Sequence, residues 1–274
     1  MSLPPHGYPL AAVVSPRLHV IETVDSTNAK LLADAAADPA GHPHLSVLLT
    51  RDQRAGRGRL DRVWTAPPGT ALAVSVLLDV AAVAHADRGW IPLVAGAALR
   101  QAIAAQLAGL EVTLKWPNDV LVSGLKISGI LAEVLPDDPH RVVVGAGVNT
   151  TMSDADRPVP TATSFAALGR EVDEDRLVAD YLTALRDGIA DLAVSGADGV
   201  RDGIAEVCAT LGTDVEVSLP DGTVLTGRAD RLDAEGRLVV ASGGTAPLSG
   251  SGTEAVVSAG DVVHVRPPRP AGTA

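Results

Sequence analysis

The sequence predicts an α+β fold in which a larger domain, residues 1–212, precedes a small β-barrel, residues 213–268. Three observations support this prediction. Up to residue 212, short apolar segments alternate with longer segments whose apolar residues recur every three or four positions, as in amphipathic helices. After residue 212, only short extended segments separated by turn residues remain, which is typical of a small barrel. A chain of 274 residues is also long for one compact domain and short for three.

The larger domain is expected to begin with an irregular arm, because residues 1–17 contain four prolines and no periodicity. Its strands are expected where apolar residues run together or alternate, over 17–24, 45–50, 71–80, 111–115, 119–122, 126–135 and 141–148. Its helices are expected where apolar residues recur at helical spacing, over 29–37, 93–107, 174–194 and 202–211. Ser26 and its polar neighbours offer N-caps to the first helix, and Gly212 offers a C-cap to the last. Loops are expected over 51–69 and 151–163.

The barrel is expected to consist of five short strands without a helix. They fall over 215–219, 224–232, 238–240, 255–257 and 262–265, with a Gly/Ser-rich loop over 242–253.

Composition and charge exclude several classes of protein. The formal net charge of −11 argues against a nucleic-acid binder held by a broad basic face, and six aromatic residues offer few stacking platforms. The single cysteine, Cys208, excludes an internal disulfide framework and fits a reducing compartment. No secretory signal and no apolar stretch long enough to span a bilayer are visible, so we expect a cytoplasmic protein with no membrane partner.

Positive charge is concentrated at residues 51–62, where five arginines and two glycines accompany only two aspartates. Like charges this close repel one another unless an anion neutralises them, and glycine lets a backbone approach a ligand closely. The segment is therefore typical of a loop that folds over a phosphate or a carboxylate. The alternative is a solvated, mobile basic loop.

A rigid polar turn is expected at Lys115-Trp116-Pro117-Asn118-Asp119. Because the proline fixes the turn, the Asn118 amide can read a base edge and the Asp119 carboxylate can hold Mg²⁺ beside phosphates. The alternative is a turn whose polar side chains cap their own backbone.

Two further segments bring polar or small residues to strands. Lys126 begins an otherwise apolar strand, so its charge needs an anionic partner: a ligand carboxylate or phosphate, Glu133 or Asp119. Gly145-Ala146-Gly147-Val148-Asn149 ends another strand with small side chains, which leave space for a flat ligand. Strands without a binding role also commonly end this way.

Taken together and in this order, these motifs closely resemble those of biotin protein ligases. The matching segments are Asp25-Ser26-Thr27-Asn28, Gln53 with Gly56-Arg57-Gly58-Arg59 and Trp64, Lys115-Trp116-Pro117-Asn118-Asp119, Lys126 with Gly129-Ile130-Leu131 and Glu133, and Gly145-Ala146-Gly147-Val148-Asn149. The resemblance implies a mixed β-sheet with flanking helices, of the biotin/lipoyl ligase-like type, followed by an SH3-like β-barrel. It also implies an ATP-dependent ligase that uses Mg²⁺, joins biotin to ATP as biotinyl-5′-AMP and passes the biotinyl group to a lysine of a biotin carboxyl carrier domain of an acyl-CoA carboxylase.

The resemblance also assigns roles to individual residues. The implied biotin-binding residues are Ser26, Thr27, Asn28, Gln53, Gly56, Arg57, Gly58, Arg59 and Lys126. The implied nucleotide-binding residues are Arg59, Trp64, Lys115, Asn118, Lys126 and Asn149. Catalysis falls to Lys126, which would meet the biotin carboxylate and the α-phosphate, with Arg59 and Asp119. Asp119 is the candidate for Mg²⁺ or for the incoming lysine.

Two departures from the family pattern affect the expected function. Members that repress transcription carry an N-terminal helix-turn-helix domain, whereas 24 residues with four prolines precede Asp25 here, so DNA binding is not expected. Leu60 and Asp61 stand where other members commonly place further Arg and Gly, which predicts weaker retention of the adenylate.

Three other functions remain open from the sequence. The first is a lipoate or octanoate ligase of the same fold, and the second is a non-catalytic biotin sensor that acts as a co-repressor. The third is a generic α/β nucleotide-binding domain with a barrel attached. Oligomeric state, monomer or weak homodimer, is also left open.

Overall fold

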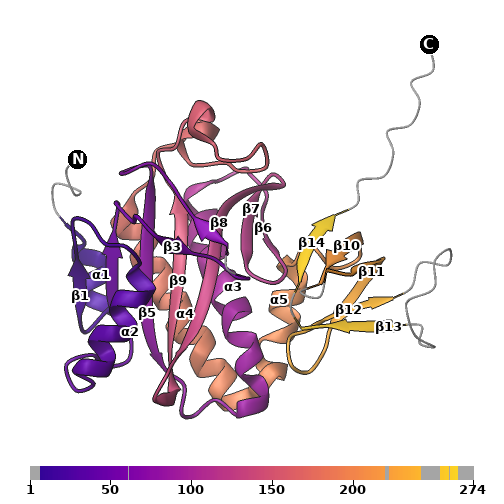
Figure 1. Ribbon diagram of the computed structural model, residues 1–274, viewed down its shortest axis with the longest axis horizontal. Coiled ribbons are helices and arrows are strands. Elements are labelled where there is room, and N and C mark those ends of the chain that lie inside the picture. Colours follow the sequence, from indigo (N-terminus) through magenta and orange to yellow (C-terminus); the bar gives the residue numbers. More distant parts are fainter. Residues whose placement is uncertain (1–6, 61, 220–221, 242–253, 259, 265–274) are drawn as a thin grey trace.

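The structure is a computed structural model that describes residues 7–60, 62–219, 222–241, 254–258 and 260–264. Its main feature is a seven-stranded sheet in the order β1-β2-β5-β9-β8-β7-β6 (Figure 1). Only β1 and β2 pair in parallel, so the sheet is mixed as predicted. Its strands are β1 (Leu18–Val20), β2 (Ser46–Thr50), β5 (Ala71–Asp79), β6 (Val112–Lys115), β7 (Asp119–Val122), β8 (Leu125–Leu135) and β9 (Asp138–Asn149).

Helices flank this sheet, most of them on one face. The α-helices are α1 (Pro9–Val14), α2 (Thr27–Ala37), α3 (Ile91–Gln106), α4 (Glu174–Ser195) and α5 (Arg201–Val207). The 3-10 helices span His85–Trp90, Asp154–Asp156, Ala166–Leu168 and Gly196–Gly199. In Figure 1, α3 and α4 lie behind the sheet, whereas the segment with β3 crosses in front of it.

The alternation of side chains along the central strands explains the two layers. In β5, Leu72, Val74 and Val76 join the large core that contains α3 and α4. Leu77 points the other way and joins a small core with Leu31 of α2. Beyond α2, the second face of β5 and β9 carries the small residues Ala73, Gly145 and Gly147 instead of large ones, and this part of the face contains the candidate site described below.

The second sheet has five antiparallel strands in the order β13-β12-β11-β10-β14. These are β10 (Asp214–Ser218), β11 (Val224–Leu232), β12 (Leu238–Ala241), β13 (Glu254–Val257) and β14 (Asp261–His264). The arrangement is consistent with an SH3-like unit, although within the described residues no pairing between β13 and β14 closes it into a barrel. Two indoles tie it to the first unit: Trp90 Nε1 donates to Ala234 O (2.8 Å) and Trp116 Nε1 donates to Gly236 O (3.1 Å).

Three expectations from the sequence are wrong in detail. The N-terminal arm is not wholly irregular, because α1 forms with Pro9 in its first turn and with Asp175 accepting from its free amides. The last helix of the larger unit ends at Val207, since Ala209 N donates to Leu114 O and the chain leaves the helix to bridge β6. The segment 51–69 is not all loop, because β3 (Gly56–Arg57) pairs with β4 (Val63–Trp64).

The expected Gly/Ser-rich loop at 242–253 lies outside the described residues. Within the described residues, no helix combines the length and the apolar character needed to cross a membrane.

Candidate active site

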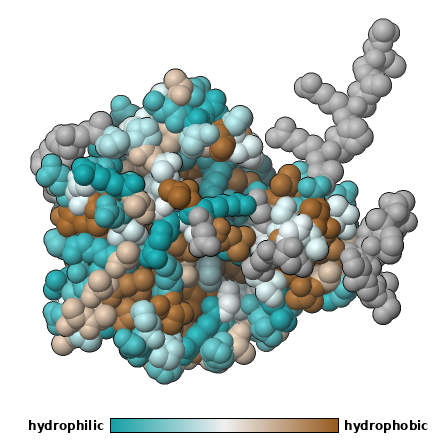
Figure 2. Space-filling model, in the orientation of Figure 1, coloured by the Kyte–Doolittle hydropathy of each residue, from teal (hydrophilic) through white to brown (hydrophobic). Residues whose placement is uncertain are grey.

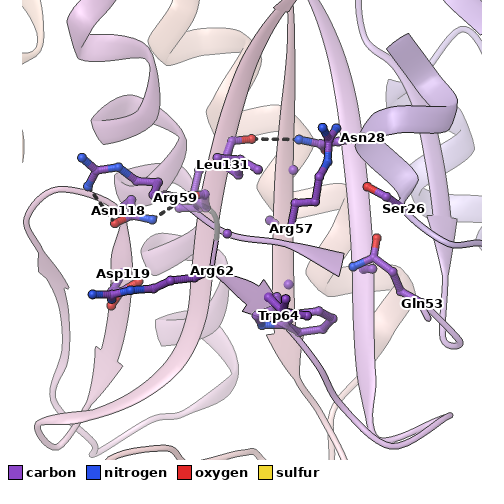
Figure 3. Close-up of a pocket in the computed structure, with 18 of the residues that line it drawn as sticks. Ser26, Asn28, Gln53, Arg57, Arg59, Arg62, Trp64, Asn118, Asp119 and Leu131 are labelled. Atoms are coloured by element: carbon purple, nitrogen blue, oxygen red, sulfur yellow. Dashed lines mark hydrogen bonds between the residues drawn. The ribbon is translucent and has the colours of Figure 1, made fainter. Parts of the chain in front are cut away.

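A cavity of about 170 Å³ lies on the face of the main sheet opposite α3 and α4. On this face hydrophilic side chains gather where the segment with β3 crosses the sheet (Figures 1 and 2). The structure brings most of the predicted site residues to this cavity: Ser26, Thr27, Asn28, Gln53, Arg57, Gly58, Arg59, Trp64, Asn118, Asp119 and Lys126 all line it (Figure 3). Gly56, Lys115 and Asn149 do not.

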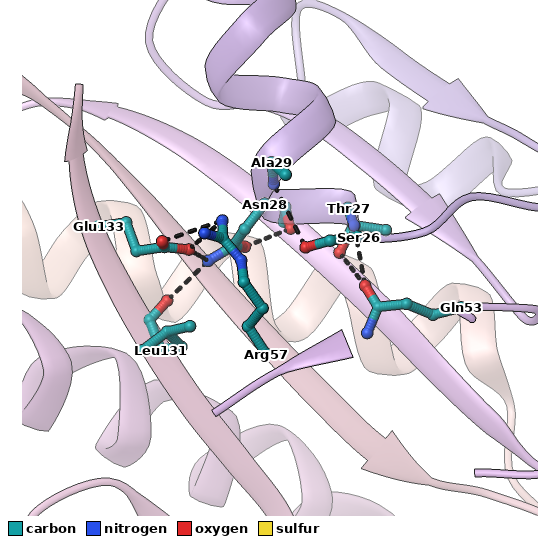
Figure 4. Close-up of polar contacts among 9 residues, drawn as sticks. Ser26, Thr27, Asn28, Ala29, Gln53, Arg57, Leu131 and Glu133 are labelled. Atoms are coloured by element: carbon teal, nitrogen blue, oxygen red, sulfur yellow. Dashed lines mark hydrogen bonds and ion pairs between the residues drawn. The ribbon is translucent and has the colours of Figure 1, made fainter. Parts of the chain in front are cut away.

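One end of the cavity is formed by the first residues of α2 and by Gln53 (Figure 4). The N-cap Ser26 accepts from Ala29 N through its hydroxyl oxygen (3.3 Å), so its own hydroxyl proton is available to a ligand. Thr27 donates to Gln53 Oε1 from its backbone N–H (2.8 Å) and from its hydroxyl (2.9 Å). These two bonds occupy the Gln53 carbonyl and turn its amide N–H₂ toward the cavity side. The pair Ser26 and Gln53 can therefore donate to a carbonyl or ring acceptor.

Asn28, in contrast, is almost fully used by the protein (Figure 4). Its amide nitrogen donates to Leu131 O (3.1 Å) and to Glu133 Oε2 (2.8 Å), and its oxygen accepts from the buried Ser75 hydroxyl (2.6 Å). An amide has two donor protons, and both are occupied here. The resemblance implies that Asn28 binds biotin; in the structure Asn28 lines the cavity and its amide also holds α2 against β8 and β5.

Glu133 was not among the predicted site residues, yet it pairs with Arg57 of the segment 51–69, which we call the arginine segment. Its carboxylate lies 2.9 Å from Arg57 Nη2 through Oε1 and 3.0 Å through Oε2, and it also accepts from Asn28. The signals in the sequence are its place in the strand that Lys126 begins and its membership of the motif that runs from Lys126 through Gly129-Ile130-Leu131. The first signal suggested Lys126 as a partner, whereas the structure gives Glu133 to Arg57.

Lys126 is paired with Asp119, one of the partners that the sequence left open. Its Nζ lies 2.6 Å from Asp119 Oδ1, and both groups line the cavity. Gly129 makes room for this pair, because a Cβ at that position would lie 3.1 Å from Lys126 Nζ. An ammonium group and a carboxylate are thereby held together where the arginine segment faces the sheet.

Arg59 and Trp64 of the arginine segment also contact the sheet. Arg59 Nη1 lies 3.4 Å from Asn118 Oδ1, and the Asn118 amide in turn donates to Ile130 O (2.7 Å). Trp64 covers the small residues of β9, since a Cβ at Gly147 would lie 2.6 Å from its ring. The space that the glycines of β9 leave is thus filled by the protein's own Asn28 and Trp64.

Lys115 and Asn149, two of the predicted nucleotide-binding residues, lie outside the cavity. Lys115 is paired in register with Asp119 across the β6–β7 hairpin, and its charge acts on His264 of the second sheet. Asn149 is buried at the end of β9, where its amide donates to Thr163 O (2.8 Å) and so fixes the segment that follows. Leu60 lines the cavity with a φ of 53°, while Asp61 lies outside the described residues.

The residues that line the cavity can help to bind a magnesium ion only if a nucleotide supplies most of its ligands. Asp119 is the one carboxylate among the described lining residues, and the described part of the chain contains no cluster of three or more potential metal ligands. Magnesium is commonly held by one or two carboxylates together with substrate phosphates and water. Asp119 can supply one oxygen of such a set.

Comparisons with known proteins identify the family to which the chain belongs. The profile of the biotin/lipoate A/B protein ligase family matches residues 20–149. A biotin--[acetyl-CoA-carboxylase] ligase from Mycobacterium tuberculosis is 39% identical over 255 residues, which cover 91% of this chain and 90% of that relative. A ligase of the same description from Paracoccus denitrificans is 38% identical over 159 residues, covering 53% of this chain and 59% of that relative.

Solved structures share the fold. A biotin protein ligase from Aquifex aeolicus, in complex with biotin and ATP, superposes with a TM-score of 0.72 at 22% identity, covering 92% of this chain and 99% of that one. The chain belongs to the biotin/lipoate A/B protein ligase family, and its identity to the M. tuberculosis enzyme over nearly its whole length places it among the biotin protein ligases.

Proposed function

We propose that this protein activates biotin with MgATP as biotinyl-5′-AMP and transfers the biotinyl group to a lysine of a biotin carboxyl carrier domain of an acyl-CoA carboxylase. The observation that supports this most directly is one cavity in which the neutral donors of Ser26 and Gln53 lie at one end and the cations Lys126 and Arg59 lie toward the other. The ureido ring of biotin needs neutral hydrogen-bond donors, and the biotin carboxylate needs cations where it approaches a phosphate.

In the first half-reaction, a carboxylate oxygen of biotin attacks the α-phosphorus of ATP, and the bond from that phosphorus to the β-phosphate bridging oxygen breaks, releasing pyrophosphate. Lys126 lies where its ammonium group can neutralise charge on the carboxylate and the α-phosphate, and Asp119 orients it (2.6 Å). Arg59, held by Asn118, adds a second cation from the segment above. Magnesium, when bound with the nucleotide, supplies further neutralisation of the phosphates. Positioning and electrostatics of this kind account for most of the catalysis in phosphoryl chemistry.

In the second half-reaction, the amine of the carrier lysine attacks the acyl carbon, the acyl–phosphate bond breaks and AMP leaves. The attacking amine loses a proton, and Asp119 is the one carboxylate of the described lining that can accept it. A segment folded over the cavity excludes water, which would otherwise hydrolyse the mixed anhydride.

Several further assignments rest on this proposal. We treat residues 1–212 as the catalytic domain, because all the lining residues of the cavity except Gly260 precede residue 213. The net charge of −11 supports the expectation that no nucleic acid is a partner. A free, buried cysteine supports action in the reducing cytoplasm.

The test is biotin-dependent pyrophosphate release with ATP and Mg²⁺, before any carrier is added. Lys126→Met is expected to lower the rate at least about 100-fold, as loss of one preorganised charge in an active site does. Lys30→Met is the matched control, because in the described contacts Lys30 pairs only with Asp34, four residues along α2, and its loss should leave the rate unchanged. Added carrier domain should then become biotinylated on its lysine.

The other outcomes decide between the alternatives. Release with lipoate or octanoate but not biotin would move the protein to the sister branch of the family. Biotin binding without pyrophosphate release would make it a sensor rather than an enzyme.

A further inference from the structure

The two ends of the arginine-rich segment meet at Arg51 and Gly69, which we call the neck. Gly69 N donates to Arg51 O (2.7 Å), and Arg51 Nη2 donates to Gly69 O (2.8 Å). Gly69 adopts a φ of 78°, which a residue with a side chain rarely does. A backbone bond and a side-chain bond therefore close the base of the segment that carries Arg57, Arg59 and Trp64.

The neck also anchors the segment 151–163. Gly69 O accepts from the Thr151 hydroxyl (2.9 Å), and the next residue, Thr70, accepts from Thr151 N (3.0 Å). The far end of 151–163 bonds to both sides of Lys126, since Lys126 N donates to Thr161 O (2.7 Å) and Thr163 N donates to Lys126 O (2.8 Å). Two segments that reach the candidate site thus share one base.

Behind the neck, Arg51 is held by a buried acid. Its Nε lies 3.4 Å from Glu174 Oε1, in the first turn of α4, and Glu174 is only 7% exposed. The other carboxylate oxygen accepts from the hydroxyl of Tyr8 (2.9 Å), itself 4% exposed. Burial, together with the charge of Glu174, raises the pKa of Tyr8 well above its ordinary value, so the hydroxyl stays a donor.

Tyr8 is itself fixed, because the helix that follows it is fastened to α4. The backbone N–H groups of Leu10 and Ala11 donate to the two carboxylate oxygens of Asp175 (3.0 and 2.9 Å). A continuous series of contacts therefore runs from α1 and α4, on the back of the sheet, to the neck of the arginine segment on the front. Arg51 does not line the cavity, so any effect it has on a ligand is exerted through the neck.

We propose that Arg51 is a positioning residue, held by Glu174, that keeps the arginine segment closed over the acyl-adenylate. The inference rests on the proposed function for the identity of the retained ligand. Its physical basis is that a planar guanidinium can donate a hydrogen bond to Gly69 O from Nη2 while its positive charge forms an ion pair with the buried Glu174, which a shorter or uncharged side chain cannot do. Without it, the side-chain half of the neck is lost and the segment opens more often.

The first experiment measures how fast biotinyl-5′-AMP leaves the enzyme that has made it. Arg51→Met keeps the length of the side chain and removes both contacts, so release is expected to be about tenfold faster, equivalent to about 1.4 kcal/mol. The turnover of pyrophosphate exchange at saturating substrate should fall less than about threefold, because no group that touches the reacting atoms has changed. Arg54→Met is the matched control: Arg54 lies in the same segment, is 65% exposed and pairs only with Asp52 in the described contacts.

Arg51→Met leaves Glu174 buried without its cation, which can destabilise the whole protein. The double variant Arg51→Met with Glu174→Gln removes that charge, and the glutamine still accepts from Tyr8. If Arg51 positions the segment, the double variant regains stability toward urea but still releases the adenylate quickly. If retention recovers together with stability, Arg51 is only a structural residue and the proposal is wrong.

A second measurement needs no ligand and no activity. Trypsin cleaves after arginine, so the rate of cleavage after Arg57 and Arg59, which all the variants retain, reports how often the segment opens in the free protein. Cleavage should accelerate several-fold in Arg51→Met and in the double variant but not in Arg54→Met, and an unchanged rate would overturn the proposal. A wild type that makes no adenylate would refute the proposed function, while the cleavage rates would still decide whether Arg51 holds the segment.

Discussion

Two glycines on the same face of β9 should respond very differently to the same added methyl group. A Cβ at Gly145 would lie less than 3 Å from Asn28 Oδ1, and one at Gly147 would lie 2.6 Å from the ring of Trp64. Both distances are shorter than real Cβ contacts, so a neighbour must move in each case. The difference is in how firmly each neighbour is held.

Asn28 cannot retreat without loss, because its amide makes three hydrogen bonds within the protein. Gly145→Ala would push its oxygen back by about 1 Å and break the bond from Ser75, whose hydroxyl is fully buried. Overpacking costs about 1–3 kcal/mol, and a lost buried hydrogen bond adds about 1 kcal/mol. We expect Gly145→Ala to lower the free energy of unfolding by about 3 kcal/mol, which for a chain of this size lowers Tm by about 6–12 °C.

Trp64 is only partly buried and belongs to a two-residue strand, so it can swing outward. Gly147→Ala should therefore change Tm by less than about 3 °C. Because the resemblance sets Trp64 beside adenine, the same substitution should raise the KM for ATP about tenfold, as loss of one stacking contact does. Thermal unfolding followed by circular dichroism and pyrophosphate exchange measure the two effects. The reasoning is refuted if Gly145→Ala melts within about 2 °C of wild type, or if Gly147→Ala is the more destabilising variant.

Three further predictions concern parts of the chain away from the cavity. Trp116→Phe removes the indole donor to Gly236 O and should lower the free energy of unfolding by about 1–2 kcal/mol. It should also speed amide hydrogen exchange in the β11–β12 turn, and unchanged exchange would contradict the role of this bond. Burial and the charge of Lys115 lower the pKa of His264, so between that pKa and about 6.5 the unfolded chain binds the extra proton. Stability should therefore be lost as pH falls through that range, by at most about 1.4 kcal/mol per pH unit, and His264→Asn should flatten the urea-denaturation profile measured from pH 5 to 8. Burial raises the pKa of the Cys208 thiol, so the native protein should react with iodoacetamide at least about 100-fold more slowly than the urea-unfolded chain; equal rates would show that the thiol is open to solvent.

Elements with a strong local signal were predictable from the sequence. The continuous apolar run of β5 and the helical periodicity of α4 each identify a buried element whatever it packs against. The helix α1 was missed because its stabilising partner, Asp175, is 164 residues away from Ala11. The early end of α5 has the same kind of cause, since pairing of Ala209 with Leu114 competes with helix continuation. A local pattern carries no information about either contact.

At the candidate site, the residues were easier to predict than their partners. Motif order drew Ser26, Gln53, Arg57 and Lys126 to one place, and the structure brings them to one cavity. The spacing of residues in the sequence could not show that the Asn28 amide nitrogen donates both its protons to β8, nor that Glu133 pairs with Arg57 rather than with Lys126. Such choices depend on which face of a strand each residue occupies after the sheet has formed, because a shift of one residue reverses the face.

The pairing of charges in the cavity changes how the arginine-rich segment should be understood. From the sequence, the segment was interpreted either as a loop that folds over an anionic ligand or as a solvated basic loop, but the sheet supplies a carboxylate for Arg57 in Glu133, 23% exposed. Lys126 of β8 likewise has a protein carboxylate, Asp119, 18% exposed, which the sequence had left open as a partner. Partly exposed ion pairs contribute only about 0–1 kcal/mol, so exchanging a protein carboxylate for the carboxylate or phosphate of a ligand costs little. The cations are therefore held in place before any ligand arrives, which favours catalysis by positioning. It follows that removing Glu133 should loosen the empty site more than the ligand-bound one, whereas removing Arg57 should weaken both.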